Sequence, residues 1–177
     1  MKIQQLIQEL DAITKEVQDT FGNLSHEALN RKSNPDTWSI AQNLDHLIVI
    51  NETYLPIFDA LKNGTYKTPF LGKFRFITSF FGNLIYKMST PEHIKPIKTM
   101  SIWEPSTSDI HNVIQSFVQH QAIMKHNISG LEDCIKLGSV IASPANPMIV
   151  YTLEQALNII VVHEKRHILQ AKKVLSA

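Results

Sequence analysis

The chain has 177 residues, of which 44% are hydrophobic and 19% charged, and its formal net charge is +1. This composition is typical of a globular protein and argues against intrinsic disorder. No basic block stands out, so nucleic acid is not an expected partner. No stretch approaches the roughly 20 apolar residues of a membrane span, and the first residues lack the apolar core of a signal peptide. Because Cys134 is the single cysteine, we expect one cytoplasmic domain over residues 1–177, with no disulfide and no membrane partner.

An amphipathic helix is predicted at the start of the chain, ending near Gly22. Its apolar residues recur at steps of three and four, the pattern of one buried helix face. They are Ile3, Leu6, Ile7, Leu10, Ile13 and Val17. The stretch RKSNPDTW that follows, residues 31–38, is a loop by composition.

Two further helices carry strong start signals. Ser39 and Gln42 match a capping box, in which each side chain bonds the backbone amide of the other residue. The helix that Ser39 opens is expected to continue to about Lys62, before Asn63-Gly64. After the loop SPANPM, Thr152 and Gln155 repeat the capping box and open the last helix.

Another helix is predicted between these two, from near Ser106 to Gly130, with Asp109 as a weaker cap partner. No run in the sequence shows sustained β-alternation. Four helices of roughly 20 residues predict an all-α fold, most simply a four-helix bundle.

The segment 66–91 is rich in aromatic residues. It holds seven of the 14 aromatic residues of the chain, and its apolar residues would line one face of a short helix that caps an end of the bundle. These are Phe74, Ile77, Phe81, Leu84, Ile85 and Met88. Core packing or a dimer contact is favoured over a substrate lid. Because the segment carries more apolar surface than capping a bundle end needs, we predict a homodimer.

Near the C-terminus, the residues from His163 to His167 read HEKRH, which matches the H-E-x-x-H pattern of zinc metalloproteases. Such proteases need a third protein ligand, and the familiar patterns place it after the motif. The residues after His167, ILQAKKVLSA, contain no His, Asp, Glu or Cys. The sequence therefore argues against a protease, although the two histidines still share one helix face and Ala156 and Ile160 direct that face inward.

A third ligand for these two histidines has to come from upstream. We prefer His46, which lies two turns past the Ser39 cap, because His163 lies about three turns past the Thr152 cap and the two helices can face each other. His120, between Phe117 and Met124, is the best substitute. The other histidines, at 26, 93, 111 and 126, are expected to be solvated or hydrogen-bonded.

Two stretches resemble a known family. TWSIAQNLDHL, residues 37–47, is similar to the Trp-Ser-x-x-(Glu/Gln)-x-Leu-x-His-Leu signature of the DinB-like superfamily, also called YfiT-like putative metalloenzymes. YTLEQALNIIVVHEKRHILQ, residues 151–170, resembles the last helix of that family with its His-x-x-x-His. The order and separation of the two motifs also match. The resemblance implies a bundle with up-down-down-up order and a divalent metal, zinc or nickel, on His46, His163 and His167.

The resemblance also implies a class of reaction. Characterised members use bacillithiol, mycothiol or related low-molecular-weight thiols, and a metal with an open position lowers the pKa of a thiol that binds it. We therefore expect a metal-dependent thiol S-transferase acting on small electrophiles. The alternative is a non-catalytic metal-binding or scaffold protein in which the metal joins two helices. Asn43 and Glu164 are candidates for residues that orient a ligand imidazole or a water, whereas Arg166 is expected on the surface.

Overall fold

The computed structural model describes residues 3–93, 99–105 and 107–176. Helices dominate these residues, and a single two-stranded sheet, β1 (Val140–Ser143) and β2 (Asn146–Thr152), joins them. The long helices are α1 (Ile3–Phe21), α3 (Ile40–Glu52), α6 (Val113–Ser129) and α8 (Leu153–Leu175). The shorter elements are α2 (His26–Asn30), α4 (Leu55–Lys62), the 3₁₀ turn η1 (Phe70–Lys73), α5 (Arg75–Ser89), the 3₁₀ turn η2 (Ser101–Trp103) and α7 (Glu132–Lys136). The prediction of a mainly helical protein is confirmed.

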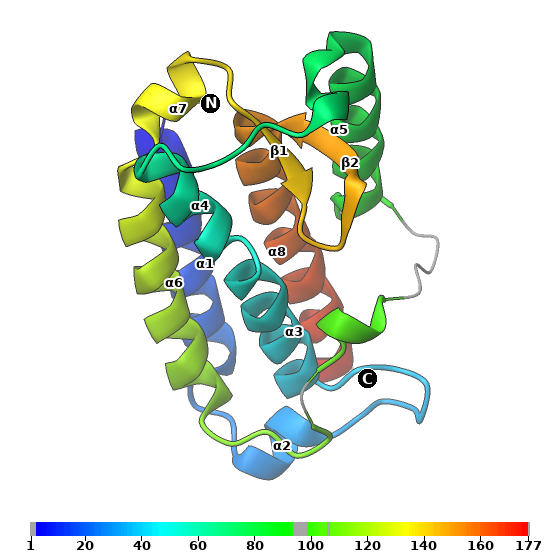
Figure 1. The fold of residues 1–177 in the computed structure, drawn as a ribbon. Helices are drawn as coiled ribbons and strands as arrows, with labels where there is room; N and C mark the ends of the chain where they lie inside the picture. Colours follow the sequence, from blue (N-terminus) through cyan, green and yellow to red (C-terminus); the bar gives the residue numbers. More distant parts are fainter. Residues whose placement is uncertain (1–2, 94–98, 106, 177) are drawn as a thin grey trace.

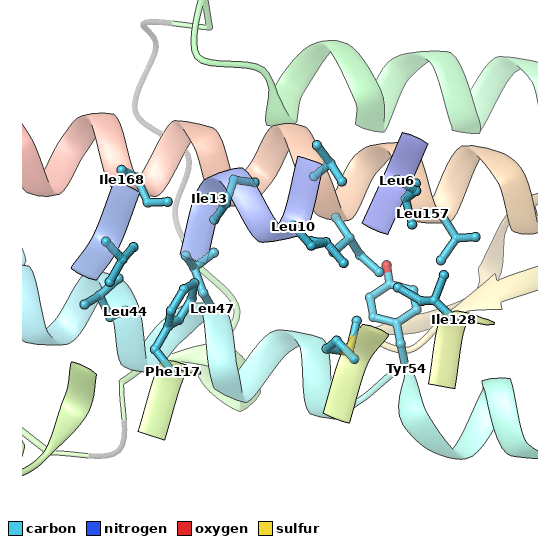
Figure 2. Close-up of a cluster of buried hydrophobic side chains, with 14 of the residues drawn as sticks. Leu6, Leu10, Ile13, Leu44, Leu47, Tyr54, Phe117, Ile128, Leu157 and Ile168 are labelled. Atoms are coloured by element: carbon cyan, nitrogen blue, oxygen red, sulfur yellow. The ribbon is translucent and has the colours of Figure 1, made fainter. Parts of the chain in front are cut away.

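The four long helices lie side by side and share one core (Figure 1). Both α1 and α3 contact both α6 and α8, so each helix buries its apolar face against two others. Figure 2 shows the side chains that meet between them, and nearly all of these are fully buried. They include Leu6, Leu10, Ile13, Leu44, Leu47, Phe117, Ile128, Leu157 and Ile168. Burying each such side chain contributes roughly 1.5–3 kcal/mol, so apolar packing is a large part of what holds α3 and α8 together. None of the helices in the described part of the chain is long and apolar enough to cross a membrane.

The first two predicted helices differ in how well the structure matches them. The first helix ends at Phe21, beside the predicted Gly22. The helix opened by Ser39 reaches Lys62 as predicted, but it breaks between Glu52 and Leu55 into α3 and α4. The cause is Pro56, which has no N–H to donate to the carbonyl four residues earlier and so interrupts the helical ladder. The single long helix expected here was wrong.

The predicted start of the third helix was also wrong. Ser106 itself lies outside the described residues, and the helix begins at Val113. Asn112 adopts a left-handed backbone conformation with φ of 54°, which no helix continues through. Asp109 does not cap the helix, because the Thr107 hydroxyl accepts its N–H instead at 3.0 Å. The end of α6 at Ser129, next to Gly130, agrees with the prediction.

The hairpin of β1 and β2 is an element that the sequence did not predict. Its strands are antiparallel, with Ile141 opposite Tyr151, and both of these side chains are buried. Only four residues form β1, and Pro147 stands inside β2, where a proline usually argues against a strand. Because β2 ends at Thr152, the hairpin leads directly into the capping box of α8.

The aromatic segment forms α5, as the sequence predicted, but it does not simply cap an end of the helix group. The helix packs along β2 and α8 (Figure 1). Gly82 permits this close approach, since a Cβ there would lie 2.2 Å from the Gln155 side chain. The outward face of this region stays open: Phe70, Phe76 and Phe80 are 69%, 74% and 62% exposed.

Candidate metal centre

The two helices that carry the histidines of interest begin at fixed points. The Ser39 hydroxyl accepts from the Gln42 amide at 3.1 Å, and the Gln42 side chain accepts from the Ser39 amide at 3.2 Å. The equivalent pair at Thr152 and Gln155 has distances of 3.1 and 3.0 Å. Both capping boxes are thus present as predicted, and each sets the depth of the histidines that follow it in its helix.

His46 from α3 and His163 and His167 from α8 converge on one point; we call these three residues the inner cluster. One ring nitrogen from each lies within 4.8 Å of the others. The ring centroids are 4.5 Å apart for His163 and His167, 4.6 Å for His46 and His167, and 5.2 Å for His46 and His163. His46 and His167 are buried and His163 is half-buried. This is the residue set preferred from the sequence, and tertiary packing of α3 on α8 brings it together.

Two oxygen atoms outside the inner cluster fix how its rings present their nitrogens. The Nδ1 of His46 lies 2.6 Å from the carbonyl oxygen of Trp103, which can only accept, so Nδ1 carries the proton and Nε2 offers a lone pair. The Nδ1 of His167 lies 2.9 Å from Asn43 Oδ1. Asn43 is oriented in turn, because its Nδ2 donates to the Ser39 carbonyl at 2.9 Å. Such partners are the usual means by which proteins orient metal-binding imidazoles.

The electrostatic surroundings keep the three imidazoles neutral. Burial lowers the pKa of His46, although the bond to Trp103 raises it in part. Burial, with His46 and Arg166 nearby, lowers the pKa of His163 to about 3. Burial and the neighbouring His163, His46 and Arg166 lower the pKa of His167 well below its ordinary value. Neutral imidazole is the form that binds a metal, so three unprotonated donors on one point fit a divalent ion such as zinc.

A large cavity opens beside the inner cluster. It has a volume of about 1180 Å³, and all three histidines line it. Trp38 lies against two of them, with ring centroids 4.8 Å from His46 and 5.8 Å from His167. Its wall combines aromatic and apolar side chains with many polar and charged ones, so it can both bury an apolar group and hydrogen-bond a polar one.

The sequence-based prediction missed several residues of this cavity and placed another one wrongly. Trp103, Tyr54 and Tyr151 line it, and the two tyrosine hydroxyls bond each other at 2.8 Å. None of these had a signal in the sequence, because the partners are 57 and 97 positions apart. Arg166, expected on the surface, is buried, lines the cavity and donates to the Met88 carbonyl.

Glu164, the glutamate of the H-E-x-x-H pattern, is turned toward the helix core. It is 0% exposed, and its two oxygens accept from Asn51 at 2.7 Å and from Gln121 at 2.8 Å. Burial raises the pKa of this carboxyl to about 7, against the opposing effect of the two amide donors. These contacts join α8 to α3 and α6. That Glu164 orients a ligand imidazole or a water stays a prediction.

The remaining histidines lie elsewhere. His26 and His111 form a separate exposed group with Asp109, which we call the outer cluster. His111 precedes α6 instead of lying on it, and His26 lies in the short helix α2 instead of a loop. His93 lines the cavity without joining either group. His120, the substitute ligand, is buried on α6, and its Nε2 has no hydrogen-bond partner among the described residues.

A family comparison agrees with this arrangement. The model of the DinB superfamily matches residues 9–171, nearly the whole chain. The chain belongs to the DinB superfamily. Members of this superfamily generally bind a divalent metal, and the histidines of the inner cluster are a group that could hold one. Among curated protein sequences none matches the chain, so the family assignment comes from the family model alone.

Proposed function

We propose that this DinB superfamily protein binds one zinc or nickel ion at His46, His163 and His167 and uses it for thiol S-transfer to small electrophiles. The observation that carries the proposal is that three neutral imidazoles, two of them with fixed tautomers, meet at the wall of a cavity of about 1180 Å³. Three protein ligands leave one position open, which is typical of catalytic and not of structural zinc sites. Among the described residues, no fourth His, Cys, Asp or Glu joins these three.

The chain's own residues would divide the work as follows. The inner cluster holds the metal, and a bound divalent metal lowers the pKa of a thiol that coordinates it, so that a thiolate is available at neutral pH. The Trp103 carbonyl oxygen orients the ring of His46, and Asn43 Oδ1 orients the ring of His167. Trp38 packs against two of the rings and helps to hold them in place. The apolar and aromatic wall binds the electrophile beside the cluster.

The test measures thiol binding and transfer in metal-loaded protein. Zinc- and nickel-loaded wild type would be titrated with cysteine and with other low-molecular-weight thiols by calorimetry, and then assayed with a fluorogenic electrophile. We expect His46→Ala to lose thiol binding and transfer while its circular dichroism stays helical, since apolar packing supplies most helix stability. His126→Ala, which removes a histidine of α6 that lies outside the cluster and the cavity, is the matched control. Equal thiol binding by His46→Ala and wild type would contradict the proposal.

The alternative is a non-catalytic site in which the metal only joins α3 to α8. The same proteins separate the two: chelation would then lower the melting temperature strongly, and no thiol would bind the loaded protein. We expect no peptidase activity with either metal. The pattern's glutamate is hydrogen-bonded to α3 and α6, away from the cluster, and the third histidine comes from upstream.

Three finer properties belong to the same proposal. We propose that α1, α3 with α4, α6 and α8 form a four-helix bundle in the up-down-down-up order of the family; their pairwise contacts support it. The exposed phenylalanines of η1 and α5 support a homodimer through this face, and sedimentation showing a monomer at micromolar concentration would contradict it.

We also propose a cytoplasmic location. A reaction that uses a free thiol and a chain with a single cysteine both fit the reducing conditions there.

A further inference from the structure

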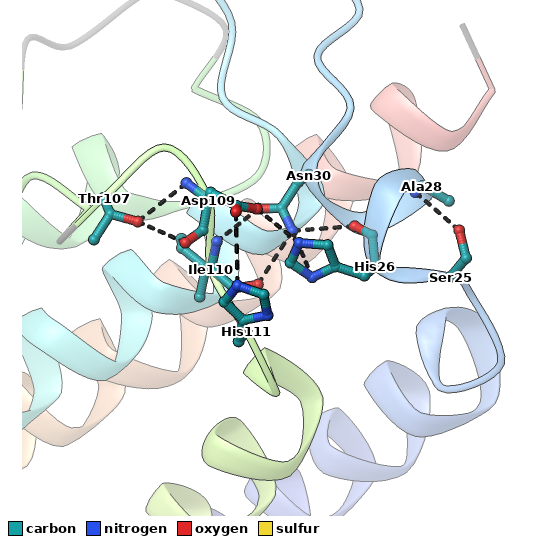
Figure 3. A network of polar contacts seen from close by, with 8 residues as sticks. All are labelled: Ser25, His26, Ala28, Asn30, Thr107, Asp109, Ile110 and His111. Atoms are coloured by element: carbon teal, nitrogen blue, oxygen red, sulfur yellow. Dashed lines mark hydrogen bonds and ion pairs between the residues drawn. The ribbon is translucent and has the colours of Figure 1, made fainter.

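The outer cluster joins two segments that are far apart in sequence (Figure 3). His26 is the first residue of α2, while Asp109 and His111 precede α6. One carboxylate oxygen of Asp109 lies 2.7 Å from His26 Nε2, and the other lies 3.6 Å from His111 Nε2. The two imidazoles stack with centroids 4.2 Å apart and an interplanar angle of 10°. Both rings therefore direct the same nitrogen toward one carboxylate.

The backbone under the outer cluster is held by side chains that do not belong to it. Asn30 bridges the two segments: its Oδ1 accepts from the Ile110 amide at 2.9 Å, and its Nδ2 donates to the carbonyls of Ile110 and His26 at 3.1 and 3.0 Å. The Thr107 hydroxyl contacts both the amide and the carbonyl of Asp109. Because these bonds fix both segments (Figure 3), the backbone that carries the two imidazoles and the carboxylate is in place before any ligand arrives.

The chemistry of this group is that of a metal site. Two imidazoles and one carboxylate form a common ligand set for zinc and its neighbours. Their donor atoms lie within 4.8 Å of one another, so rotation of exposed side chains suffices to bring them to bonding distance. We propose that the outer cluster is a second binding site for a divalent metal of the zinc class. The ion takes the place of the His26 Nε2 proton, that proton moves through solvent to Nδ1, whose 3.3 Å contact with Asn30 Nδ2 then opens, and water completes the coordination.

The exposure of the outer cluster sets what kind of site this is. His111 is 71% exposed at its side chain, so a bound ion exchanges readily with solvent and binds more weakly than an ion held by buried ligands. The outer cluster also lies next to the cavity of the inner cluster. Thr107 and Ser108, next to the outer cluster, line the cavity of the inner cluster, so an ion at the outer cluster ties one wall of that cavity to α2.

Zinc and nickel titrations of the full chain test the proposal. We expect wild type to bind a second, weaker equivalent of metal, and His111→Ala to weaken that binding by at least about tenfold. Asp109→Asn should do the same. His126→Ala, which removes a histidine of α6 that lies outside both clusters, is the matched control and should leave both equivalents unchanged.

The same titration keeps this inference separate from the proposed function. His46→Ala should remove the stronger equivalent and keep the weaker one, whatever the protein catalyses. Zinc-edge anomalous scattering from soaked crystals should show a peak between His26 and His111, and zinc should slow amide exchange at Asp109 and Ile110. A weaker equivalent that persists in both His111→Ala and Asp109→Asn would overturn the proposal. If one of these two variants loses both metal binding and its helical circular dichroism, the metal binding of the other variant decides the test.

Discussion

The inner and outer clusters use nearly the same side chains under opposite conditions. The inner cluster stands on α3 and α8, two long helices with capping boxes, and two of its three imidazoles are buried. The outer cluster stands on a five-residue helix and a loop, and two of its three members are exposed. We therefore expect the scaffold and the burial, and not the number of histidines, to decide which cluster binds a metal more tightly.

The difference also appears in what orients the rings. In the inner cluster, oxygens of Trp103 and Asn43 accept from Nδ1 and leave Nε2 free to bind. In the outer cluster, the carboxylate that orients the rings is itself the third donor. An ion there has to displace existing hydrogen bonds, whereas an ion at the inner cluster meets lone pairs without a competing proton. We expect the inner cluster to bind more tightly for this reason.

The largest expected effect is the loss of an inner ligand. His167→Ala should weaken zinc binding at the inner cluster by more than about a hundredfold, beyond what loss of an orienting partner costs. The corresponding change at the outer cluster, His111→Ala, should cost about tenfold. Competition with a chromophoric chelator measures both values in one preparation. Equal losses of affinity at the two clusters would contradict the expectation that the inner cluster binds zinc more tightly.

Loss of an orienting residue should have the next largest effect. Asn43→Ala removes the oxygen that holds the proton of His167 Nδ1, and we expect zinc affinity at the inner cluster to fall about 10- to 100-fold. Asn43→Asp keeps an acceptor for His167 Nδ1 but loses the donor to the Ser39 carbonyl, so its affinity should fall by less than that of Asn43→Ala. Chelator competition again gives the values, and Asn127→Ala, on the outer part of α6, controls for general effects. A zinc affinity unchanged in Asn43→Ala would show that burial alone orients His167.

The parts of the molecule that the sequence predicted are those set by local contacts. The capping boxes at Ser39 and Thr152 bond residues three positions apart, so a short stretch contains all the information. The choice of His46 followed from counting helical turns from these caps. The resemblance to a known family implied the same three histidines, and that count did not depend on it.

The parts that the sequence did not predict depend on distant partners. Trp103 reaches His46 across 57 positions, and Asn51 reaches Glu164 across 113; no periodicity reveals such pairs. The start of α6 is set by the left-handed Asn112 and by Asn30 bonding Ile110 from α2. The break before α4 is different, because Pro56 was visible in the sequence and predicts an interruption.

His120 is buried but belongs to neither cluster, so its pKa shows the effect of burial in a histidine that is not a proposed metal ligand. Burial lowers the pKa of His120 to about 4. The unfolded chain takes up a proton at this residue between about pH 6.5 and pH 4 that the folded chain does not. Its contribution to stability is therefore fully present above pH 6.5 and is lost as the pH falls toward 4, by up to roughly 1.4 kcal/mol per pH unit.

The measurement is urea unfolding of wild type and His120→Leu across this pH range. The free energy of unfolding should fall less steeply on acidification in the variant. The other buried histidines are common to both proteins, so their effects cancel in the difference. Parallel curves would mean that His120 is protonated in the folded state or that its environment is not desolvating.

The smallest expected effect concerns the glutamate of the H-E-x-x-H pattern. In Glu164→Gln, the new side chain still accepts from Asn51, and its amide can donate to Gln121. The Oε1 of Gln121 has no hydrogen-bond partner among the described residues. Rotating the Gln121 amide by half a turn brings this oxygen to face the new amide donor. No buried carboxyl remains to be desolvated. We expect zinc affinity and thiol transfer to stay within about twofold of wild type, and stability at pH 8 to be equal or higher.

The control for this substitution is Glu164→Leu, which leaves the Asn51 and Gln121 amides without an acceptor. Each unpaired buried amide costs about 1–3 kcal/mol, so this variant should unfold at lower urea concentration while its inner cluster keeps its ligands. In a metalloprotease the glutamate is the general base, and its replacement by glutamine would abolish turnover. Retained thiol transfer in Glu164→Gln, with retained zinc, therefore assigns the glutamate to the helix core. Loss of transfer with zinc and fold intact would assign it to the reaction instead.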